Sequence, residues 1–381
     1  MRILVAPDSY KGSLSAITAA NAIARGLLKV FPKADVLKVP IADGGEGTVE
    51  ALVTATGGKF IYTEVVGPLS EKVQARWGIL GEGKTAVIEM AAASGLTLIP
   101  VEKRNPSLTT TYGTGQLIKA ALDKGLRKFI IGIGGSGTND GGAGLAQALG
   151  VKFLDINNNE LPPGGKALGK LVTINMADLD KRLQQAEIIV ACDVDTHLCG
   201  ASGATLVFGP QKGATPAMVE ELEVALENYQ KIASQTTGKD VAAIPGAGAA
   251  GGLGAGLMFF TKAKLQSGVE ILLEASGLNK KMETADLVVT GEGCTDFQTV
   301  FGKAPVGIAK LAKKFNVPVV CLSGSLGQGY QNVLTCDIDA VMDIIPRPME
   351  IKECMKDAET LTEEAATRLG LLLQVGIMLK M

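Results

Sequence analysis

Short apolar runs alternate with amphipathic segments at both ends of this 381-residue chain, and this alternation restricts the fold more than any other feature. Arg2–Ala6 predicts a buried strand, Ser15–Val30 a helix with one apolar face, and Val36–Ile41 a second strand. Strands separated by helices pair in parallel, because the helix is the crossover between them. The same alternation returns from Leu287 onward. The sequence therefore predicts an α/β protein with a parallel sheet.

The middle of the chain has a different pattern. Three runs predict strands joined by short glycine-containing turns, as in an antiparallel sheet: Phe60–Val66, Val73–Leu80 and Thr85–Met90. The simplest arrangement is one parallel-sheet domain, interrupted by an inserted domain of mixed α/β structure. We place the interrupted domain at residues 1–60 and 257–381, and the insertion at residues 61–256.

The composition excludes several classes of protein. With 37 basic and 39 acidic residues the net charge is −2, so nucleic acid and membranes are poor candidates for partners. His197 is the only histidine, which excludes multi-histidine zinc sites. The six cysteines form no CxxC pair and the first residues lack a signal-peptide core, so we expect reduced thiols and a cytoplasmic location. Homo-oligomers are compatible with this composition, which leaves the oligomeric state open.

Six apolar runs end on glycine, serine, aspartate or glutamate. In open α/β sheets the ligand binds beyond the carboxyl ends of the strands. Glycines there let backbone N–H groups reach an anion, whereas acidic side chains bind cations. Together they favour a phosphate held with a divalent cation, although each acid alone is also an ordinary helix cap. The runs are Val5–Ser9, Val39–Gly47, Ile131–Ser136, Val190–Asp195, Val288–Gly293 and Cys321–Ser325.

Two glycine motifs have weak support. Gly78–Thr85 fits the P-loop pattern GxxxxGK[ST], but the following residues predict a strand where a P-loop needs a helix, so we interpret Glu82-Gly83 as a hairpin turn. Gly132–Gly137 fits the dinucleotide pattern GxGxxG, follows a strand and precedes Asp155 at the end of another. A second match at Gly246–Gly251 shows how readily a chain with 48 glycines produces this pattern. NAD binding is therefore kept as an alternative.

The segment Gly291–Gly307 carries the most specific combination of side chains. It follows a predicted strand, leads into a predicted helix, and contains two carboxylates, a glutamine, threonine hydroxyls and Lys303. Phosphoryl transfer uses such groups, because carboxylates hold Mg²⁺ while cations and hydrogen-bond donors stabilise the transferred phosphoryl group.

Six ordered motifs span nearly the whole chain: Asp8–Ser13, Ala42–Gly47, Gly132–Gly144, Ala191–Asp195, Phe208–Gly213 and Gly291–Lys303. Together they resemble the bacterial type-1 glycerate kinase (glycerate 2-kinase) family. The resemblance implies ATP- and Mg²⁺-dependent phosphorylation of D-glycerate to 2-phosphoglycerate, in glycolate, glyoxylate or sugar-acid catabolism. It also implies a Rossmann-like or flavodoxin-like domain interrupted by an inserted α/β domain.

Two positions depart from the family pattern. Thr196-His197 stands where Asn-Pro is common, and Cys294 stands where Arg is common. If that arginine holds phosphate, one contact is missing here or is supplied by a nearby lysine. We interpret His197 as incidental and Cys192 as a small buried hydrophobe.

Candidate site residues follow from what a hydroxy acid and ATP require. Transfer to a hydroxyl needs a general base, a metal ligand and cations for the anionic groups. Acids at strand ends and lysines beside glycine meet these needs, although capping aspartates and solvated lysines are the ordinary alternatives. The predicted roles are catalytic for Asp193, Asp195 and Lys11; substrate-binding for Asp8, Ser9, Asp43, Glu46 and Lys212; cofactor-binding for Gly134, Gly135, Ser136, Gly291, Glu292 and Lys303; and metal-binding for Asp193, Asp195 and Asp296. Which of Asp193 and Asp195 is the base stays open.

Three classes of function are compatible with these features. A small-molecule kinase is favoured, because of the acids at the strand ends. An NAD-dependent dehydrogenase acting on a small hydroxy acid and a non-catalytic protein that binds sugar acids are the alternatives. Glycerate-dependent release of ADP marks the first, an NADH absorbance change without ATP the second, and binding without turnover the third.

Overall fold

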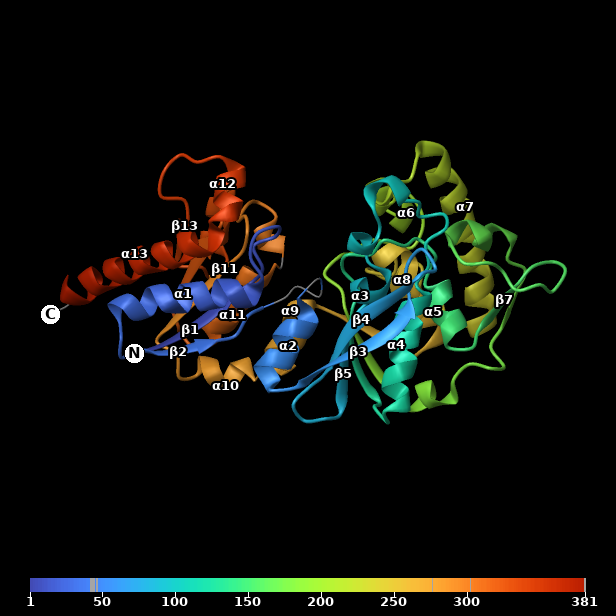
Figure 1. Ribbon diagram of the computed structural model, residues 1–381, viewed down its shortest axis with the longest axis horizontal. Helices are drawn as coiled ribbons and strands as arrows, with labels where there is room; N and C mark the ends of the chain where they lie inside the picture. The colour runs from blue at the N-terminus through green and yellow to red at the C-terminus, as the bar shows by residue number, and fades with distance from the viewer. Residues whose placement is uncertain (42–44, 46, 276, 302, 380–381) are drawn as a thin grey trace. The chain divides into compact units, whose positions relative to one another are not determined.

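The computed structural model describes residues 1–41, 45, 47–275, 277–301 and 303–379 (Figure 1). The candidate residues Asp43 and Glu46 lie outside these ranges. The chain divides into two compact units, the first comprising Met1–Asp43 and Val269–Met381, the second Gly44–Gly268. The predicted α/β class and parallel sheet are confirmed. The domain boundaries drawn from the sequence stay a prediction.

Five parallel strands form the sheet of the first unit: β1 Arg2–Pro7, β2 Asp35–Lys38, β11 Leu287–Gly291, β12 Val319–Ser323 and β13 Ala340–Asp343. Their order is β13-β12-β11-β1-β2. β1 pairs with β11 in the register Ile3↔Leu287, so these two strands share a sheet as predicted. The chain moves outward from β1 to β2 on one side and from β11 to β13 on the other. The border between β1 and β11 is therefore the topological switch point, where sheets of this kind bind ligands.

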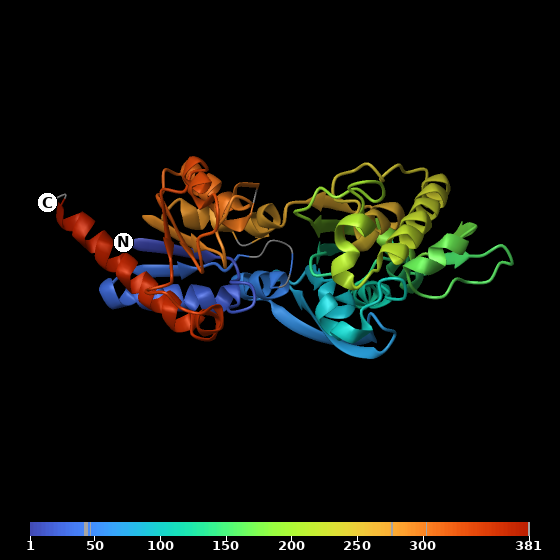
Figure 2. The same cartoon turned by 90° about the horizontal axis from the view of Figure 1, so that it is seen from above.

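Two long helices cover one face of this sheet. The helices of the first unit are α1 Ala16–Val30, α9 Gly268–Ala275, α10 Leu278–Met282, α11 Ala304–Lys314, α12 Ile351–Lys356 and α13 Ala358–Leu379. Ser15 caps α1 by accepting a hydrogen bond from the backbone nitrogen of Thr18 at 3.1 Å, as an N-cap serine does. The apolar sides of α1 and α13 share a core with Ile3 and Val5. Figure 2 shows the two helices side by side, and α11 packs against β1, β11 and β12.

Six strands form the main sheet of the second unit: β3 Lys59–Val66, β4 Lys72–Ile79, β5 Thr85–Glu89, β6 Lys128–Gly132, β9 Glu187–Ala191 and β10 Lys264–Gln266. Their order is β10-β9-β6-β5-β4-β3. β3, β4 and β5 pair antiparallel, as predicted, whereas β5, β6, β9 and β10 pair in parallel. A separate antiparallel pair consists of β7 Lys152–Leu154 and β8 Thr173–Asn175. The parallel half gives this unit its own row of carboxyl strand ends.

Helices pack on this sheet around a large apolar core. They are α2 Thr48–Thr56, α3 Ala91–Ser94, α4 Tyr112–Asp123, α5 Ala143–Ala148, α6 Ala204–Phe208, α7 Pro216–Thr237 and α8 Ala249–Phe260. α2 lies against β4 and β5, although the sequence placed it in the other domain. Trp77 is fully buried in the core, and its indole N–H donates to the hydroxyl of Thr63 at 2.9 Å. The polar end of the tryptophan is thus satisfied inside the apolar core.

The structure explains why both glycine motifs are chance matches. Gly83 has φ +75° in the turn between β4 and β5, so the P-loop pattern lies on a hairpin as expected. After Gly132–Gly137 the next helix begins only at Ala143, and Asp155 follows a strand of the separate two-stranded sheet. A dinucleotide fingerprint needs a helix directly after the glycines and an acid on the neighbouring strand. In the part of the chain that the structure describes, Gly132–Gly137 therefore lacks the helix and the acid that the NAD-binding alternative requires.

Among the described residues, no helix combines the length and the apolar character that crossing a bilayer requires. The stretch of residues 241–261, which contains no charged residue, is folded into the second unit. α8 is buried along its whole length, and its backbone is kinked at Ala250, Gly251 and Gly252, which all have positive φ. This kink brings Gly251 against the carbonyl oxygen of Thr138.

The close packing of α1 on α13 gives a stability test. A Cβ at Gly26 would contact the backbone oxygen of Glu363 and lie 2.7 Å from the Cβ of Ala366. We expect Gly26→Ala to lower the free energy of unfolding by about 1–3 kcal/mol, because overpacking outweighs the better helix propensity of alanine. Urea denaturation of the whole chain measures this change.

Gly376 on α13 is the matched control, because a Cβ added there would meet no atom within 4 Å. Gly376→Ala should leave stability unchanged or raise it by up to about 1 kcal/mol. Equal gains for both variants would show that Gly26 is not required for the helix contact.

Candidate active site

The switch point of the first unit brings several predicted residues together. The backbone nitrogen of Asp8 donates to the carbonyl oxygen of Gly291 at 2.8 Å, which joins the ends of β1 and β11. Asp8 is 7% exposed, and its carboxylate accepts a hydrogen bond from the backbone nitrogen of Ser9 at 2.6 Å. Glu292 follows Gly291 directly. The predicted grouping of Asp8, Ser9, Gly291 and Glu292 therefore exists in space.

Glu292 is a buried acid that holds the loop between β11 and α11. Its Oε1 accepts hydrogen bonds from the hydroxyls of Thr299 at 2.7 Å and Thr295 at 3.2 Å. Its Oε2 lies 3.4 Å from the ammonium of Lys303. Burial raises the pKa of Glu292, while these hydrogen bonds and Lys303 oppose the rise. Both carboxylate oxygens are thus used to position the loop.

Lys303 lies between two acids. Besides Glu292, the carboxylate of Asp296 is 3.7 Å from the Lys303 nitrogen. The same lysine is the N-cap residue of α11. The structure therefore places a cation beside a helix N-terminus, where both favour an anion. The predicted cofactor role of Lys303 and metal role of Asp296 remain predictions.

A buried set of hydroxyls lies behind Glu292, and no individual role was assigned to them from the sequence. The hydroxyls of Thr295 and Ser323 lie 2.7 Å apart, and the thiol of Cys321 is 3.3 Å from Ser323. The hydroxyl of Tyr10 donates to the carbonyl oxygen of Leu322 at 2.6 Å. Ser323 ends β12 and belongs to Cys321–Ser325, one of the polar strand ends selected from the sequence, but no role was assigned to it there. The neighbouring candidate Lys11 is exposed in the turn after Tyr10, and its backbone nitrogen lies against Gly293.

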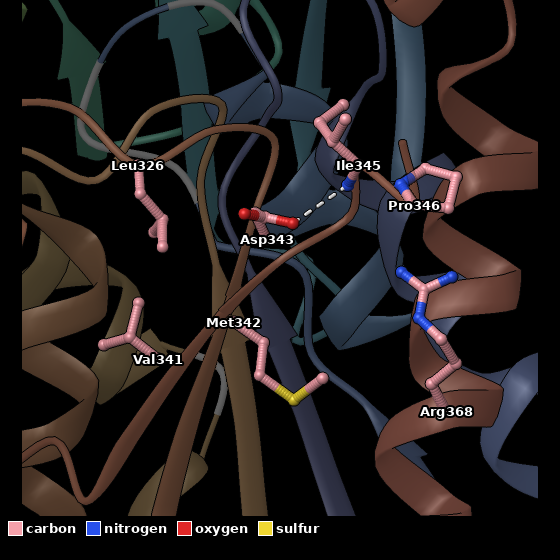
Figure 3. A pocket seen from close by; sticks show the side chains of 7 residues that line it. All are labelled: Leu326, Val341, Met342, Asp343, Ile345, Pro346 and Arg368. Carbon is pink, nitrogen blue, oxygen red and sulfur yellow. Dashed lines mark hydrogen bonds between the residues drawn. The ribbon is translucent and has the colours of Figure 1, made fainter. Parts of the chain in front are cut away.

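A pocket of about 390 Å³ opens at the carboxyl end of β13 (Figure 3). Its lining residues are Leu326, Val341, Met342, Asp343, Ile345, Pro346 and Arg368. Asp343 accepts a hydrogen bond from the backbone nitrogen of Ile345 at 3.1 Å, and the guanidinium of Arg368 donates to the carbonyl oxygen of Ile344 at 3.4 Å. None of the predicted site residues lines this pocket, because its apolar residues look like ordinary core positions in the sequence.

In the second unit, the loop after β6 presents the candidates Gly134, Gly135 and Ser136. The carbonyl oxygen of Gly135 accepts from the backbone nitrogen of Leu96 at 2.9 Å, so part of this backbone is already hydrogen-bonded within the unit. Gly135 has φ +72° and is exposed. Its glycine identity is explained by this left-handed conformation.

Asp193 and Asp195 follow the carboxyl end of β9 and are both exposed. The two carboxylate oxygens of Asp193 accept from the backbone nitrogen of Gly268 at 3.1 and 3.3 Å. Residues 192–196 form no regular strand. Within the described ranges, no three His, Cys, Asp or Glu side chains are grouped to hold a metal ion. Mg²⁺ is commonly held by one or two carboxylates and by substrate phosphates, so this pair stays a prediction.

Lys212 is only 1% exposed, whereas a lysine beside glycine in a loop is ordinarily solvated. Its ammonium donates to the carbonyl oxygen of Thr138 at 2.7 Å. Burial lowers the pKa of Lys212 to about 7, and the charge of Asp140 partly opposes this shift. A lysine with this pKa changes charge near neutral pH.

Asp140 is a second buried charge, and sequence reasoning did not select it. Its carboxylate accepts from the backbone nitrogen and the hydroxyl of Thr111, both at 2.8 Å, and from the backbone nitrogens of Gly142 at 3.1 Å and Gly144 at 3.2 Å. Burial raises the pKa of Asp140, and these hydrogen bonds oppose the rise. Its only sequence signal was its place inside the glycine-rich segment.

Cys294 and His197, which depart from the family pattern, and Cys192 show no sign of a catalytic role in their described surroundings. Cys294 is exposed in the loop after β11, and His197 is partly buried with its Nδ1 unpartnered among the described residues. The thiol of Cys192 donates to the carbonyl oxygen of Val194 at 3.4 Å. Burial raises the pKa of Cys192, which suits a small packed side chain and opposes a nucleophile.

The buried lysine predicts a pH-dependent stability. The unfolded chain keeps the Lys212 proton up to a pKa of about 10.5, whereas the folded chain releases it near 7. Between these values the unfolded state binds more protons, so this residue makes stability rise with pH. The measured quantity is the free energy of unfolding of the wild type minus that of Lys212→Met. We expect this difference to increase between pH 7 and 10, by at most about 1.4 kcal/mol per pH unit. Urea denaturation of both proteins across this range measures it, and a flat difference would contradict a lowered pKa.

The chain is similar to known proteins over nearly its whole length. The family model described as the glycerate kinase family matches residues 3–374. The chain is 51% identical to a glycerate kinase of Halalkalibacterium halodurans, over 97% of both chains. It is 49% identical to a glycerate 2-kinase of Escherichia coli K12, over 99% of both. A crystal structure of a Salmonella typhimurium LT2 protein, provisionally named glycerate kinase 2, is 47% identical and superposes with a TM-score of 0.87 over 99% of each chain. The chain therefore belongs to the glycerate kinase family.

Proposed function

We propose that this chain transfers the γ-phosphoryl group of ATP to a hydroxyl of D-glycerate, with 2-phosphoglycerate as the product. The observation that carries this proposal is the identity of about half the residues with glycerate kinases over nearly the whole chain. The relative named glycerate 2-kinase, 49% identical over 99% of this chain, supports the 2-hydroxyl as acceptor.

The switch point of the first unit is the proposed site for the nucleotide phosphates. Gly291 places backbone at the end of β11, and Lys303 adds a cation at the N-terminus of α11. Backbone N–H groups at a helix N-terminus and a nearby ammonium both stabilise phosphate oxygens. Glu292, with both oxygens engaged, keeps this loop in one conformation. The glycines at 134 and 135 stay candidates for further phosphate contacts.

The pocket beside β13 suits the adenosine part of the same nucleotide. In the sheet, β12 separates β13 from β11, so the pocket lies about two strand spacings, or roughly 10 Å, from the switch point. Its apolar lining can cover a purine ring, and the carboxylate of Asp343 can accept a hydrogen bond from a ribose hydroxyl (Figure 3). Phosphates at the switch point and a base at this pocket lie along one sheet edge.

The proposed chemistry assigns one of Asp193 and Asp195 as general base and the other as a ligand of Mg²⁺. The base takes the proton of the attacking hydroxyl, and the other carboxylate would hold a Mg²⁺ ion, which when bound would supply positive charge for the phosphate oxygens. Both carboxylates are exposed and therefore accessible to ligands. Asp193 is also oriented by the nitrogen of Gly268. Asp296 is a further proposed contact to Mg²⁺, and Lys11 to the transferred group.

A cytoplasmic location fits this proposal. All six cysteines are free thiols, as expected in a reducing compartment. ATP is also supplied there.

The reaction itself is the first test. Purified protein with ATP, Mg²⁺ and D-glycerate should release ADP in a coupled assay, and phosphorus NMR should show the phosphate on the 2-hydroxyl. Absence of ADP release across a range of pH and divalent metals would overturn the proposal. An absorbance change of NADH with glycerate and no ATP would instead support the dehydrogenase.

The second test separates the two aspartates from surface acids. Asp193→Asn or Asp195→Asn should lower kcat about 100-fold or more, because removal of a general base typically costs this factor. The fold should persist, since both side chains are exposed. Glu220→Gln on the exposed side of α7 is the control and should change kcat little. If both variants kept a kcat close to that of wild type while Asp43→Asn or Asp296→Asn lost activity, the catalytic role would belong to Asp43 or Asp296.

A further inference from the structure

Three segments of the second unit meet around Lys212. The glycine-rich loop after β6 contacts this lysine through the carbonyl oxygen of Thr138, 2.7 Å from the ammonium. The next residue, Asn139, donates from its amide to the hydroxyl of Thr205 on α6 at 3.0 Å. The loop is thus joined twice to the segment that carries Lys212.

The loop of residues 104–111 completes the group. A Cβ at Gly213 would lie 2.8 Å from the Cβ of Arg104, so Arg104 packs directly beside the residue after Lys212. The hydroxyl of Thr109 donates to the carbonyl oxygen of Gly137 at 2.9 Å. All three segments therefore contact one another.

These three segments carry most of the buried polar side-chain atoms that have no hydrogen-bond partner. Within the described residues there are six such side-chain atoms, and four belong to these segments: Arg104 Nε, Ser107 Oγ, Thr138 Oγ1 and Asn139 Oδ1. More than 90% of buried polar groups in folded proteins are paired, because an unpaired one costs about 1–3 kcal/mol. Ser107, Thr138 and Asn139 are at most 4% exposed. Four unpaired atoms on three segments that contact one another indicate a ligand that completes them.

The charges and donors define the chemistry of that ligand. Arg104 is a cation and Lys212 is one when protonated, whereas the carboxylate of Asp140 is already saturated by four hydrogen bonds. The unpaired guanidinium nitrogen and two hydroxyls can donate to anionic oxygens. The unpaired Asn139 Oδ1 can only accept, so it needs a donor on the ligand. A carboxylate with an adjacent hydroxyl meets both requirements, whereas a fully ionised inorganic anion does not.

We propose that Arg104, Ser107, Thr138, Asn139 and Lys212, the carboxylate cradle, bind the carboxylate of the hydroxy-acid substrate, with a substrate hydroxyl donating to Asn139. The identity of that acid as D-glycerate rests on the proposed function. The cradle reaches the surface at Arg104, whose side chain is only partly buried. Ser107, Thr138 and Asn139 are specificity residues in this assignment, and they add to the predicted substrate contact of Lys212.

The test uses variants that remove only the unpaired hydroxyls, in the full-length protein. In Thr138→Val and Ser107→Ala an orphaned polar group is replaced by an apolar one, so the free protein should be as stable as wild type or more stable. A hydrogen bond to a charged group is lost from the complex, so the KM for D-glycerate should rise about 10-fold or more, with kcat little changed. The increase in melting temperature caused by D-glycerate without ATP should shrink in parallel.

Thr114→Val is the matched control. Thr114 is another buried threonine of this unit, but its hydroxyl is paired with that of Ser94 at 3.0 Å. This variant should lose stability and keep the wild-type KM. The opposite signs of the stability change in Thr138→Val and Thr114→Val separate an unpaired hydroxyl from a paired one.

Two outcomes overturn the cradle. If Thr138→Val loses stability and keeps the wild-type KM, the unpaired atoms hold an ordered water. If D-glycerate stabilises all variants equally, the acid binds elsewhere. The proposed function is tested separately and fails if the wild type releases no ADP with D-glycerate. The comparison of melting temperatures still tests the carboxylate cradle in that case, because it needs no turnover.

Discussion

The pairing of β1 with β11 is the constraint on which the rest of the first unit depends. It joins Ile3 to Leu287, so a strand from the beginning of the chain and one from its last third lie in adjacent register. The chain between them must therefore return to this unit, and a long stretch of it folds as a unit of its own. That stretch is residues 44–268, with a separate sheet and a separate core. The same pairing creates the switch point, because the chain runs outward from β1 and β11 in opposite directions.

The two units treat buried polar groups differently. Both carboxylate oxygens of Glu292 have a hydroxyl or a lysine beside them, so this buried side chain is satisfied without any ligand. Around Lys212 a buried ammonium has a single carbonyl contact in the described structure, with four unpaired polar atoms in the segments that surround it. The first arrangement stabilises a loop conformation. The second is unfavourable in the free protein and becomes favourable when an anion with a hydroxyl enters, as preorganised sites do.

Local sequence predicts much of the architecture, but not the contacts between distant residues. Apolar periodicity predicts β1, α1, β11 and the antiparallel run β3 to β5, because burial on one face dictates the spacing of apolar side chains. The rule that ligands bind at the carboxyl ends of strands selects Asp8 and Gly291, which the structure joins by a hydrogen bond. The sequence context that made Gly132–Gly137 resemble a dinucleotide site was wrong. The local pattern does not reveal that the strand before Asp155 belongs to another sheet. Lys212 and Thr138 are 74 positions apart, and only the fold makes one the buried partner of the other.

Burial of Lys212 has a consequence that a solvated lysine would not have. Its pKa near 7 means that the free protein carries this charge only part of the time at neutral pH. An anion bound beside it favours the charged form and raises that pKa, so binding and protonation reinforce each other. Asp140 contributes negative charge to the same environment, but its carboxylate is held by Thr111 and the backbone and cannot move to replace a ligand. Asp140 therefore neutralises the charge of Lys212 only in part, and a bound carboxylate completes the neutralisation.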